Sequence, residues 1–239
     1  MRQVVHIPPP AAVPGREAVL RRVGVPPQAA PGPRLEALLG EALKTLAATA
    51  APAGVLAPIA VTDFAGVYQG DGGNEPETPL AGIFPRAEDL ALFAVTLGPR
   101  VVEKIARLFA SRDYALASLL DAAASEATEA AAGFVEGRFR DTLAARHRLG
   151  PATGLLRYSP GYCGWHVSGQ GALLSFVRAE EIGIRLRETF LMEPLKSMSG
   201  VIVSGPREIH EFADDYGFCH SCRTRTCRAR IRDVMAGGG

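Results

Sequence analysis

Apolar residues recur every three or four positions along several stretches of the chain, which is the spacing of one face of an α-helix. Between residues 34 and 50 leucines and alanines follow this spacing, and Pro52 and Gly54 come after the last of them. Between residues 113 and 147 the chain is rich in alanine, leucine, glutamate and arginine, which all favour helices. The pattern predicts helices over residues 16–23, 34–50, 100–110, 113–147 (as one long helix, or two with a kink) and 171–182.

Shorter stretches rich in β-branched and aromatic residues predict strands. They cover residues 55–68 (as one or two strands), 89–97, 187–192 and 201–204, and the Pro- and Ser-rich residues 193–200 predict a turn. Helices and strands follow one another without regular βαβ alternation. The expected fold class is therefore α+β with a largely antiparallel sheet.

Changes of composition along the chain suggest three parts. Residues 1–33 are rich in proline and predict an N-terminal arm laid on the surface of the body. Residues 34–216 form the expected body, and residues 217–239 form a tail rich in cysteine and arginine. We find no internal repeat and no low-complexity linker that would divide the body into independent domains.

The overall composition describes a globular protein and excludes several partners. The 239 residues are 47% hydrophobic and 21% charged, with a net charge of +1. A main role in nucleic-acid binding is disfavoured, because such proteins usually carry a strong basic excess. No run of about 18 apolar residues predicts a membrane span, and the N-terminus lacks the pattern of an export signal. We expect a cytoplasmic protein, in which the four cysteines bind metal or act in redox chemistry more often than they form disulfides.

The strongest candidate site is the segment from Arg157 to His166. Arg157 offers a planar fork of donors that suits a carboxylate or a phosphate. Pro160 and Gly161 form a turn whose backbone can approach a ligand closely. Flat rings that also carry polar groups come from Tyr158, Tyr162 and Trp165. The segment could hold a charged, flat small molecule, and the alternative is an ordinary Pro-Gly turn with packing aromatics.

The predicted long helix carries a second set of candidate residues. Glu129 and Glu136 are seven positions apart and share one face of the helix. The alternative is a solvated helix face, because glutamate is mostly exposed. Small residues on one face would let another element pack very closely against this helix: Ala123, Ala127, Ala130 and Ala131.

The tail contains a possible metal site. A C-x-x-C pair can bring two thiolates to one metal ion from a tight turn, and a third cysteine follows five residues later. These ligands are Cys219, Cys222 and Cys227, and the candidates for a fourth are Cys163, His220 and His210. With Cys163 all four cysteines of the chain would bind one zinc ion or iron–sulfur cluster. The alternatives are a thiol redox pair or a terminal segment without a metal.

Several ordered motifs resemble the activation domain of cobalamin-dependent methionine synthase, in its stand-alone form. The family's R-x-x-P-G-Y loop is present as Arg157, Pro160, Gly161 and Tyr162. The sequence EIGIRLRETF, which begins at Glu181, resembles an I-G-hydrophobic-x-L-x-E-S-F block, and Ser197 to Gly200 (SMSG) resembles an S-V-S-G turn. Glu129 stands where the family has a ligand-binding glutamate within A-E-A. The resemblance extends over residues 88–216.

The resemblance implies a fold and an activity. The fold would be a curved, largely antiparallel sheet flanked by helices, with a shallow site for S-adenosylmethionine. The domain would dock on a corrinoid protein whose cobalt has been oxidised. One electron from a flavodoxin- or ferredoxin-type donor and the methyl group of S-adenosylmethionine would then restore the methylated cobalt. The protein would be a methyltransferase component, active only with a corrinoid partner, and its own contribution would be placement of the methyl group over the metal.

The resemblance also implies roles for individual residues. Arg157 would bind the ligand's carboxylate and Glu129 its ammonium group. Backbone groups of Ser159, Pro160 and Gly161 would hold the ligand, and Tyr162, the candidate catalytic residue, would lie near the sulfonium and the corrin edge. By position alone, Trp165 and His166 are this chain's own candidates for contact with the corrin.

Two features of the sequence depart from the large enzyme. The chain lacks methyltransferase barrels and the D-x-H-x-x-G corrinoid signature, so we expect it to act in trans on a separate corrinoid protein or on a methionine synthase without its own activation domain. The cysteine tail lies outside the family's domain and would carry an iron–sulfur cluster that relays the electron. The alternative function is a non-catalytic module that docks corrinoid proteins or senses S-adenosylmethionine and has a structural zinc. An ordinary small-molecule methyltransferase is disfavoured, because no strand–glycine-rich loop–helix fingerprint is present.

Overall fold

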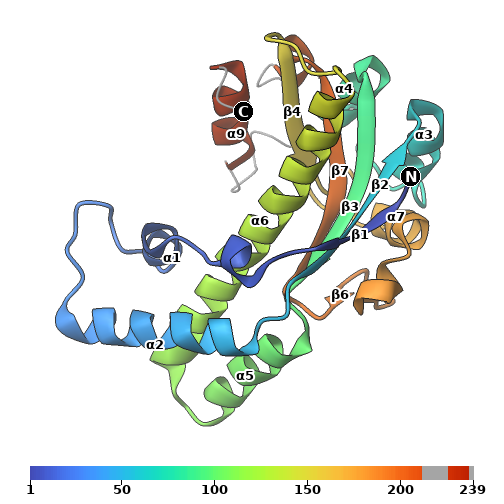
Figure 1. Cartoon of the computed structure of the whole chain (residues 1–239). Coiled ribbons are helices and arrows are strands. Elements are labelled where there is room, and N and C mark those ends of the chain that lie inside the picture. Colours follow the sequence, from blue (N-terminus) through green and yellow to red (C-terminus); the bar gives the residue numbers. More distant parts are fainter. Residues whose placement is uncertain (212–225, 237–239) are drawn as a thin grey trace.

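A five-stranded antiparallel sheet lies at the centre of the computed structural model, which describes residues 1–211 and 226–236 (Figure 1). Neighbouring strands pair in the order β1-β2-β3-β7-β4, and every pair is antiparallel. The strands are β1 (Gln3–His6), β2 (Ala53–Ile59), β3 (Asp89–Thr96), β7 (Ser197–Pro206) and β4 (Thr153–Tyr158). Two short strands, β5 (Arg185–Leu186) and β6 (Met192–Glu193), form a separate ribbon.

Helices cover both faces of this sheet. On one face the long helix α6 (Tyr114–Ala145) crosses the strands, and α1 (Arg16–Arg22), α2 (Pro33–Thr49) and α5 (Pro99–Ala110) pack around it (Figure 1). On the other face lie α3 (Val61–Gln69), α4 (Pro79–Ile83) and α7 (Gly169–Val177). The remaining helical elements are the 3₁₀ turns η1 (Pro9–Ala12), η2 (Phe84–Arg86), η3 (Ala179–Ile182) and η4 (Arg207–His210), and the C-terminal helix α9 (Thr226–Met235).

The central strand β3 shows why the sheet is covered twice. Its side chains alternate, so that Phe93 and Val95 belong to the apolar cluster around α6 while Leu92 and Ala94 belong to the cluster around α7. A strand that is buried on both faces has no polar positions to alternate with apolar ones, which accounts for the continuous apolar sequence of residues 90–95.

Helix α6 begins at a side-chain cap and packs through small residues. The carboxylate of Asp113 accepts a hydrogen bond from the backbone N–H of Leu116, which satisfies one of the free donors of the first turn. Of the four alanines that the sequence placed on one face, Ala123, Ala127 and Ala131 are buried and Ala130 is half-buried. Because these side chains are single methyl groups, the helix axis lies close to the sheet and to α2.

The structure confirms the α+β class and the antiparallel sheet, and it corrects several predicted elements. Residues 61–69 form helix α3 and not a strand, with Phe64, Val67 and Tyr68 buried at helical spacing. Strand β4 was not predicted, and the predicted turn over residues 193–200 already contains the start of β7. The predicted strand over residues 187–192 is wrong, because residues 187–191 form the turn between β5 and β6, in which Phe190 has a positive φ of 60°.

The N-terminal segment is more than a surface arm. Strand β1 forms an edge of the central sheet by pairing with β2, and the side chains of Ile7 and Val19 are fully buried. Arg2 also contacts a segment far along the chain, where its guanidinium donates a 2.7 Å hydrogen bond to the carbonyl of Val177 at the end of α7. The segment therefore belongs to the folded body. Within the described part of the chain, no helix combines the length and apolarity needed to cross a membrane.

Candidate functional site

Arg157 lies near the end of β4, where the strand leads into a closed loop. Strand β4 pairs with β7, and the register places Arg157 opposite Ile202. The loop is closed by backbone hydrogen bonds from Tyr162 N–H to the carbonyl of Ser159 (3.2 Å) and from Gly161 N–H to the carbonyl of Trp165 (2.8 Å). Gly161 has a φ of 86°, a conformation that favours glycine. The loop is thus a built feature of the fold and not a loose turn.

A cavity of about 800 Å³ opens between this loop, α6, the start of β7, and helices α1 and α9. This volume lies in the range of small-molecule sites. The loop contributes Arg157, Tyr158, Ser159, Pro160, Tyr162 and Cys163 to its lining, and α6 contributes Glu126 and Glu129. The other lining residues used below are Arg21 and Arg22 of α1, Ser197 and Ser199 of β7, Gln170 of α7, and Arg230 of α9.

Arg157 and Glu129, the two charged residues expected to bind the ligand, lie close to each other in the lining of this cavity. The Nη2 atom of Arg157 lies 3.7 Å from a carboxylate oxygen of Glu129, and its Nε atom lies 2.6 Å from a carboxylate oxygen of Glu136. The side chain of Arg157 is 11% exposed, whereas that of Glu129 is 43% exposed. Glu136 also pairs with Arg140 at 3.8 Å. Glu136 therefore fixes the guanidinium from the side of the helix, and Glu129 stays accessible to a ligand.

One donor of Arg157 is left over by these ion pairs. Its Nη1 atom is shielded from solvent and has no hydrogen-bond partner among the residues that the structure describes. A buried donor without an acceptor is unfavourable, so the position favours a ligand that brings an oxygen. An acceptor beside Arg157 and a cation beside Glu129 would both be stabilised, which is the charge pattern of an amino-acid zwitterion.

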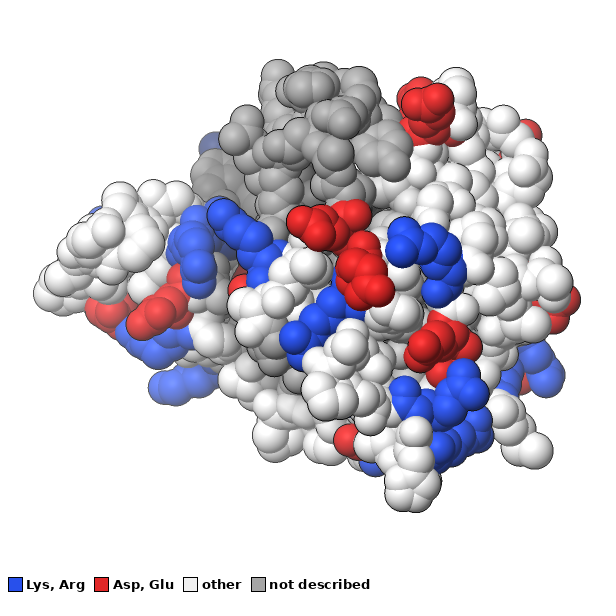
Figure 2. All heavy atoms as spheres, turned by 90° about the horizontal axis from the view of Figure 1, so that it is seen from above, with Lys and Arg blue, Asp and Glu red and all other residues white. Residues whose placement is uncertain are grey.

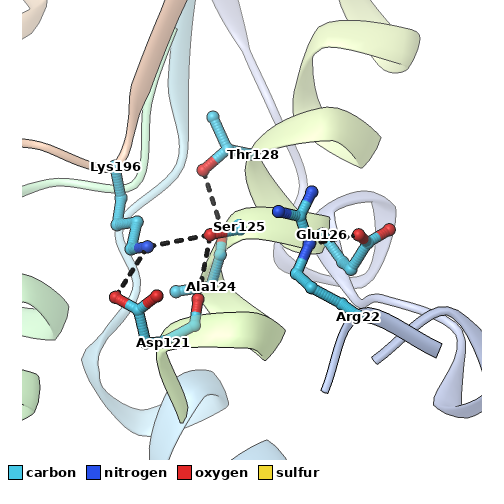
Figure 3. Close-up of polar contacts among 7 residues, drawn as sticks. All are labelled: Arg22, Asp121, Ala124, Ser125, Glu126, Thr128 and Lys196. Atoms are coloured by element: carbon cyan, nitrogen blue, oxygen red, sulfur yellow. Dashed lines mark hydrogen bonds and ion pairs between the residues drawn. The ribbon is translucent and has the colours of Figure 1, made fainter. Parts of the chain in front are cut away.

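Polar contacts of α6 fasten two of the elements that line the cavity, β7 and α1 (Figure 3). The ammonium of Lys196 lies 2.8 Å from a carboxylate oxygen of Asp121 and donates a hydrogen bond to the hydroxyl of Ser125, also at 2.8 Å. Lys196 thereby fastens the start of β7 to α6. On the neighbouring face of α6, Arg22 pairs with Glu126 at 2.5 Å and fastens helix α1. The sequence alone gave no reason to select these residues, because each pair joins segments far apart along the chain.

A second buried polar pair lies behind the loop. His210 is fully buried, its Nε2 atom lies 3.3 Å from the carbonyl of Gly154, and its Nδ1 atom lies 3.0 Å from the hydroxyl of Tyr158. Since a carbonyl can only accept, Nε2 carries the proton and the Tyr158 hydroxyl donates to Nδ1. Burial lowers the pKa of His210 below its ordinary value. Both ring nitrogens are engaged, so His210 is not available here as a fourth metal ligand.

The two residues proposed by position for corrin contact lie away from the cavity. Trp165 is 1% exposed and packs edge-on against Phe64, with 5.7 Å between ring centroids, so its ring is not accessible to a ligand. His166 is exposed, but its ring bonds to the hydroxyl of Ser168 at 2.9 Å, and it does not line the cavity. Tyr162, by contrast, is 55% exposed at the cavity wall. Of the three rings of this loop that the sequence singled out, only Tyr162 is both exposed and part of the cavity.

The predicted metal ligands fall largely outside the described part of the chain. Cys219 and Cys222 lie in the segment 212–225, and Cys227 lies in α9 at a position whose side chain is not described. Cys163 lines the cavity. Among the described residues no three or more histidine, cysteine, aspartate or glutamate side chains are grouped to hold a metal ion. The metal site therefore stays a prediction.

Charged side chains of both signs lie near one another on the surface of the molecule. Figure 2 shows lysine, arginine, aspartate and glutamate side chains interspersed over the described part of the face seen from above.

Comparison with known proteins gives a family and a fold. The family described as "Vitamin B12 dependent methionine synthase, activation domain" matches residues 83–213. A crystal structure of the MetH reactivation domain bound to AdoHcy superposes with a TM-score of 0.59 at 16% sequence identity, over 98% of this chain and 90% of that one. No curated protein sequence matches the chain.

Proposed function

Because the match covers more than half of the chain, this protein belongs to the activation-domain family of vitamin B12 dependent methionine synthase, and we propose that it uses S-adenosylmethionine to reactivate an oxidised corrinoid protein. A related domain of the same fold binds AdoHcy, the product that remains when S-adenosylmethionine loses its methyl group. The partner would be a corrinoid-binding protein, or a methionine synthase without its own activation domain, reached in trans.

The observation that carries this proposal is the opposed pair of Arg157 and Glu129 in one cavity of about 800 Å³. The free Nη1 donor of Arg157 suits the ligand's carboxylate, and the exposed carboxylate of Glu129 suits its ammonium group. Both ends of an amino-acid group are thus met from two different elements, β4 and α6. The residues present fit the amino-acid part of S-adenosylmethionine.

The loop after Arg157 would hold the rest of the ligand. Ser159 and Pro160 line the cavity, and Gly161 allows the backbone to turn there. Tyr162 would lie beside the sulfonium at the side from which the corrin docks. When bound, the ligand supplies a methyl group on a positively charged sulfur. The protein's residues would orient that group and keep it at the open face, which is a proximity effect.

The electron for the cobalt would come from a flavodoxin- or ferredoxin-type donor. We propose that four cysteines bind one metal centre: Cys163, Cys219, Cys222 and Cys227. An iron–sulfur cluster there would take part in the electron transfer, whereas a zinc ion would stabilise the docking surface. Metal analysis and an optical spectrum after anaerobic purification would decide between iron, zinc and no metal. A metal-free protein that still supports reactivation would exclude an electron relay through these cysteines.

A calorimetric titration with S-adenosylmethionine tests the proposed site. We expect saturable binding to the unaltered protein and at least tenfold weaker binding to Arg157→Ala and Glu129→Gln, where each tenfold is about 1.4 kcal/mol. Glu103→Gln is the matched control, because Glu103 is an exposed glutamate on α5 and forms only a 4.0 Å surface pair. Equal affinity in all three variants would contradict the proposed site.

A further inference from the structure

The C-terminal helix α9 places an arginine in the cavity from outside the segment that matches the family. Helix α9 packs against β4 and η4, and Val234 is buried in that contact. A Cβ atom at Gly154 would lie 2.7 Å from Val234 Cγ1, so the missing side chain at Gly154 is what lets α9 close on β4. Arg230 lies four residues before Val234 and therefore on the same face of the helix, and it lines the cavity.

Arg230 is not neutralised by the described part of the protein. Its Nε atom is shielded from solvent without a hydrogen-bond partner, and no ion pair to Arg230 is present among residues 1–211 and 226–236. Two other arginines of the lining are different, because Arg157 pairs with two glutamates and Arg22 pairs with Glu126. The remaining one, Arg21, is exposed to solvent, whereas Arg230 is half-buried. Arg230 is therefore a cation beside a ligand cavity, and its Nε donor has no acceptor among the described residues.

The charges around Arg157 explain why a second cation is useful. Arg157 and Arg140 face Glu129 and Glu136, so this cluster is neutral as a whole. A carboxylate that enters the cluster meets two existing carboxylates and only the Nη1 donor of Arg157. A further guanidinium in the lining of the same cavity would offset this repulsion and supply parallel N–H donors.

We propose that Arg230 is a second carboxylate-binding residue, which shares the ligand's carboxylate with Arg157 while Glu129 binds the ammonium group. This inference rests on the proposed function, since it assigns a further residue to the same ligand. It also gives the C-terminal helix a direct part in the binding site. Arg230 is a binding residue and takes no part in the methyl transfer itself.

Two ligands that differ in the carboxylate test the assignment. S-adenosylmethionine carries the amino-acid group, and 5′-deoxy-5′-methylthioadenosine keeps the nucleoside and lacks it. We expect Arg230→Ala to bind S-adenosylmethionine at least tenfold more weakly than the unaltered protein does. Its affinity for methylthioadenosine should stay within about twofold of that of the unaltered protein. Arg230→Lys, which keeps the charge and loses the fork, should fall between Arg230→Ala and the unaltered protein. Arg232→Ala is the matched control, because Arg232 is exposed on the same helix and does not line the cavity.

Each other outcome is decisive. Unchanged affinity of Arg230→Ala for S-adenosylmethionine overturns the assignment and leaves the proposed function intact. Equal losses of affinity for both ligands in Arg230→Ala also overturn the assignment, because they indicate that Arg230 only supports the packing of α9. If the unaltered protein binds neither ligand, the proposed function fails and the inference fails with it. If thermal unfolding of Arg230→Ala shows that α9 has lost its packing, Arg230→Gln is used in its place, because glutamine keeps most of the side chain.

Discussion

Replacing Gly200 by alanine should destabilise both the fold and the site, because β7 touches the Arg157 loop at this position. A Cβ atom at Gly200 would lie 2.3 Å from the carbonyl oxygen of Tyr158, 2.9 Å from Phe93 Cε1 and 3.0 Å from Ser159 Oγ. The first contact is with backbone, which cannot rotate away as a side chain can. Strand β4 or the loop that follows it must therefore shift.

The expected cost follows from the kind of contact. Overpacking of a well-packed interior costs roughly 1–3 kcal/mol, and a backbone obstacle places Gly200→Ala near the upper end. The smaller entropy of alanine in the unfolded chain offsets about 0.4–1 kcal/mol of this. A net loss of about 2 kcal/mol lowers the thermal midpoint of a domain of this size by roughly 4–8 °C.

Urea denaturation followed by circular dichroism measures this loss, and Gly205→Ala is the matched control on the same strand. At Gly205 the nearest atom is Ile209 Cδ1 at 2.8 Å, the end of a flexible side chain, and the next contact is at 3.5 Å. We expect the control to lose less than about 1 kcal/mol. Equal urea midpoints for the two variants would refute the close-approach argument. Because the loop would be distorted, Gly200→Ala should also bind S-adenosylmethionine more weakly, whereas Gly205→Ala should not.

Two further predictions concern ionisable groups. Glu136→Gln removes the anion nearest to the largely buried Arg157 and should lower the free energy of unfolding by about 1–3 kcal/mol. The exposed control Glu103→Gln should change it by less than about 0.5 kcal/mol. Urea titration measures both variants, and equal effects would contradict the role of Glu136. Burial lowers the pKa of His210, so below about pH 6.5 the unfolded chain takes up a proton that the folded protein does not, and stability should fall as the pH drops through this range. This fall should be smaller in His210→Gln, and an identical pH dependence of the urea midpoint would show that His210 does not cause it.

The sequence predicted those parts of the site that depend on local periodicity. Glu129 and Glu136 were expected on one face of one helix, and both face Arg157 in the structure. The seven-residue spacing was sufficient for this, because α6 is regular over its whole length. The motif around Arg157 and Tyr162 likewise indicated a loop that could hold a ligand.

The parts that were missed depend on contacts between distant segments. Strand β4 is short and follows directly on a long helix, so its pattern is weak without its partner β7. No local signal distinguishes Trp165, which is buried by α3, from Tyr162, which is exposed. Arg22 and Arg230 come from the two ends of the chain and reach the cavity only because α1 packs on α6 and α9 packs on β4.

The central claim is tested most directly by following the methyl group. The protein would be incubated anaerobically with S-adenosylmethionine carrying a labelled methyl group, a one-electron reductant and the corrinoid-binding part of a methionine synthase loaded with oxidised cobalamin. The account predicts label on the corrinoid, one AdoHcy formed for each methyl transferred, and neither product when any component is left out or when Arg157→Ala replaces the protein. Tight binding of S-adenosylmethionine without any transfer of label would contradict reactivation and favour a docking or sensing module.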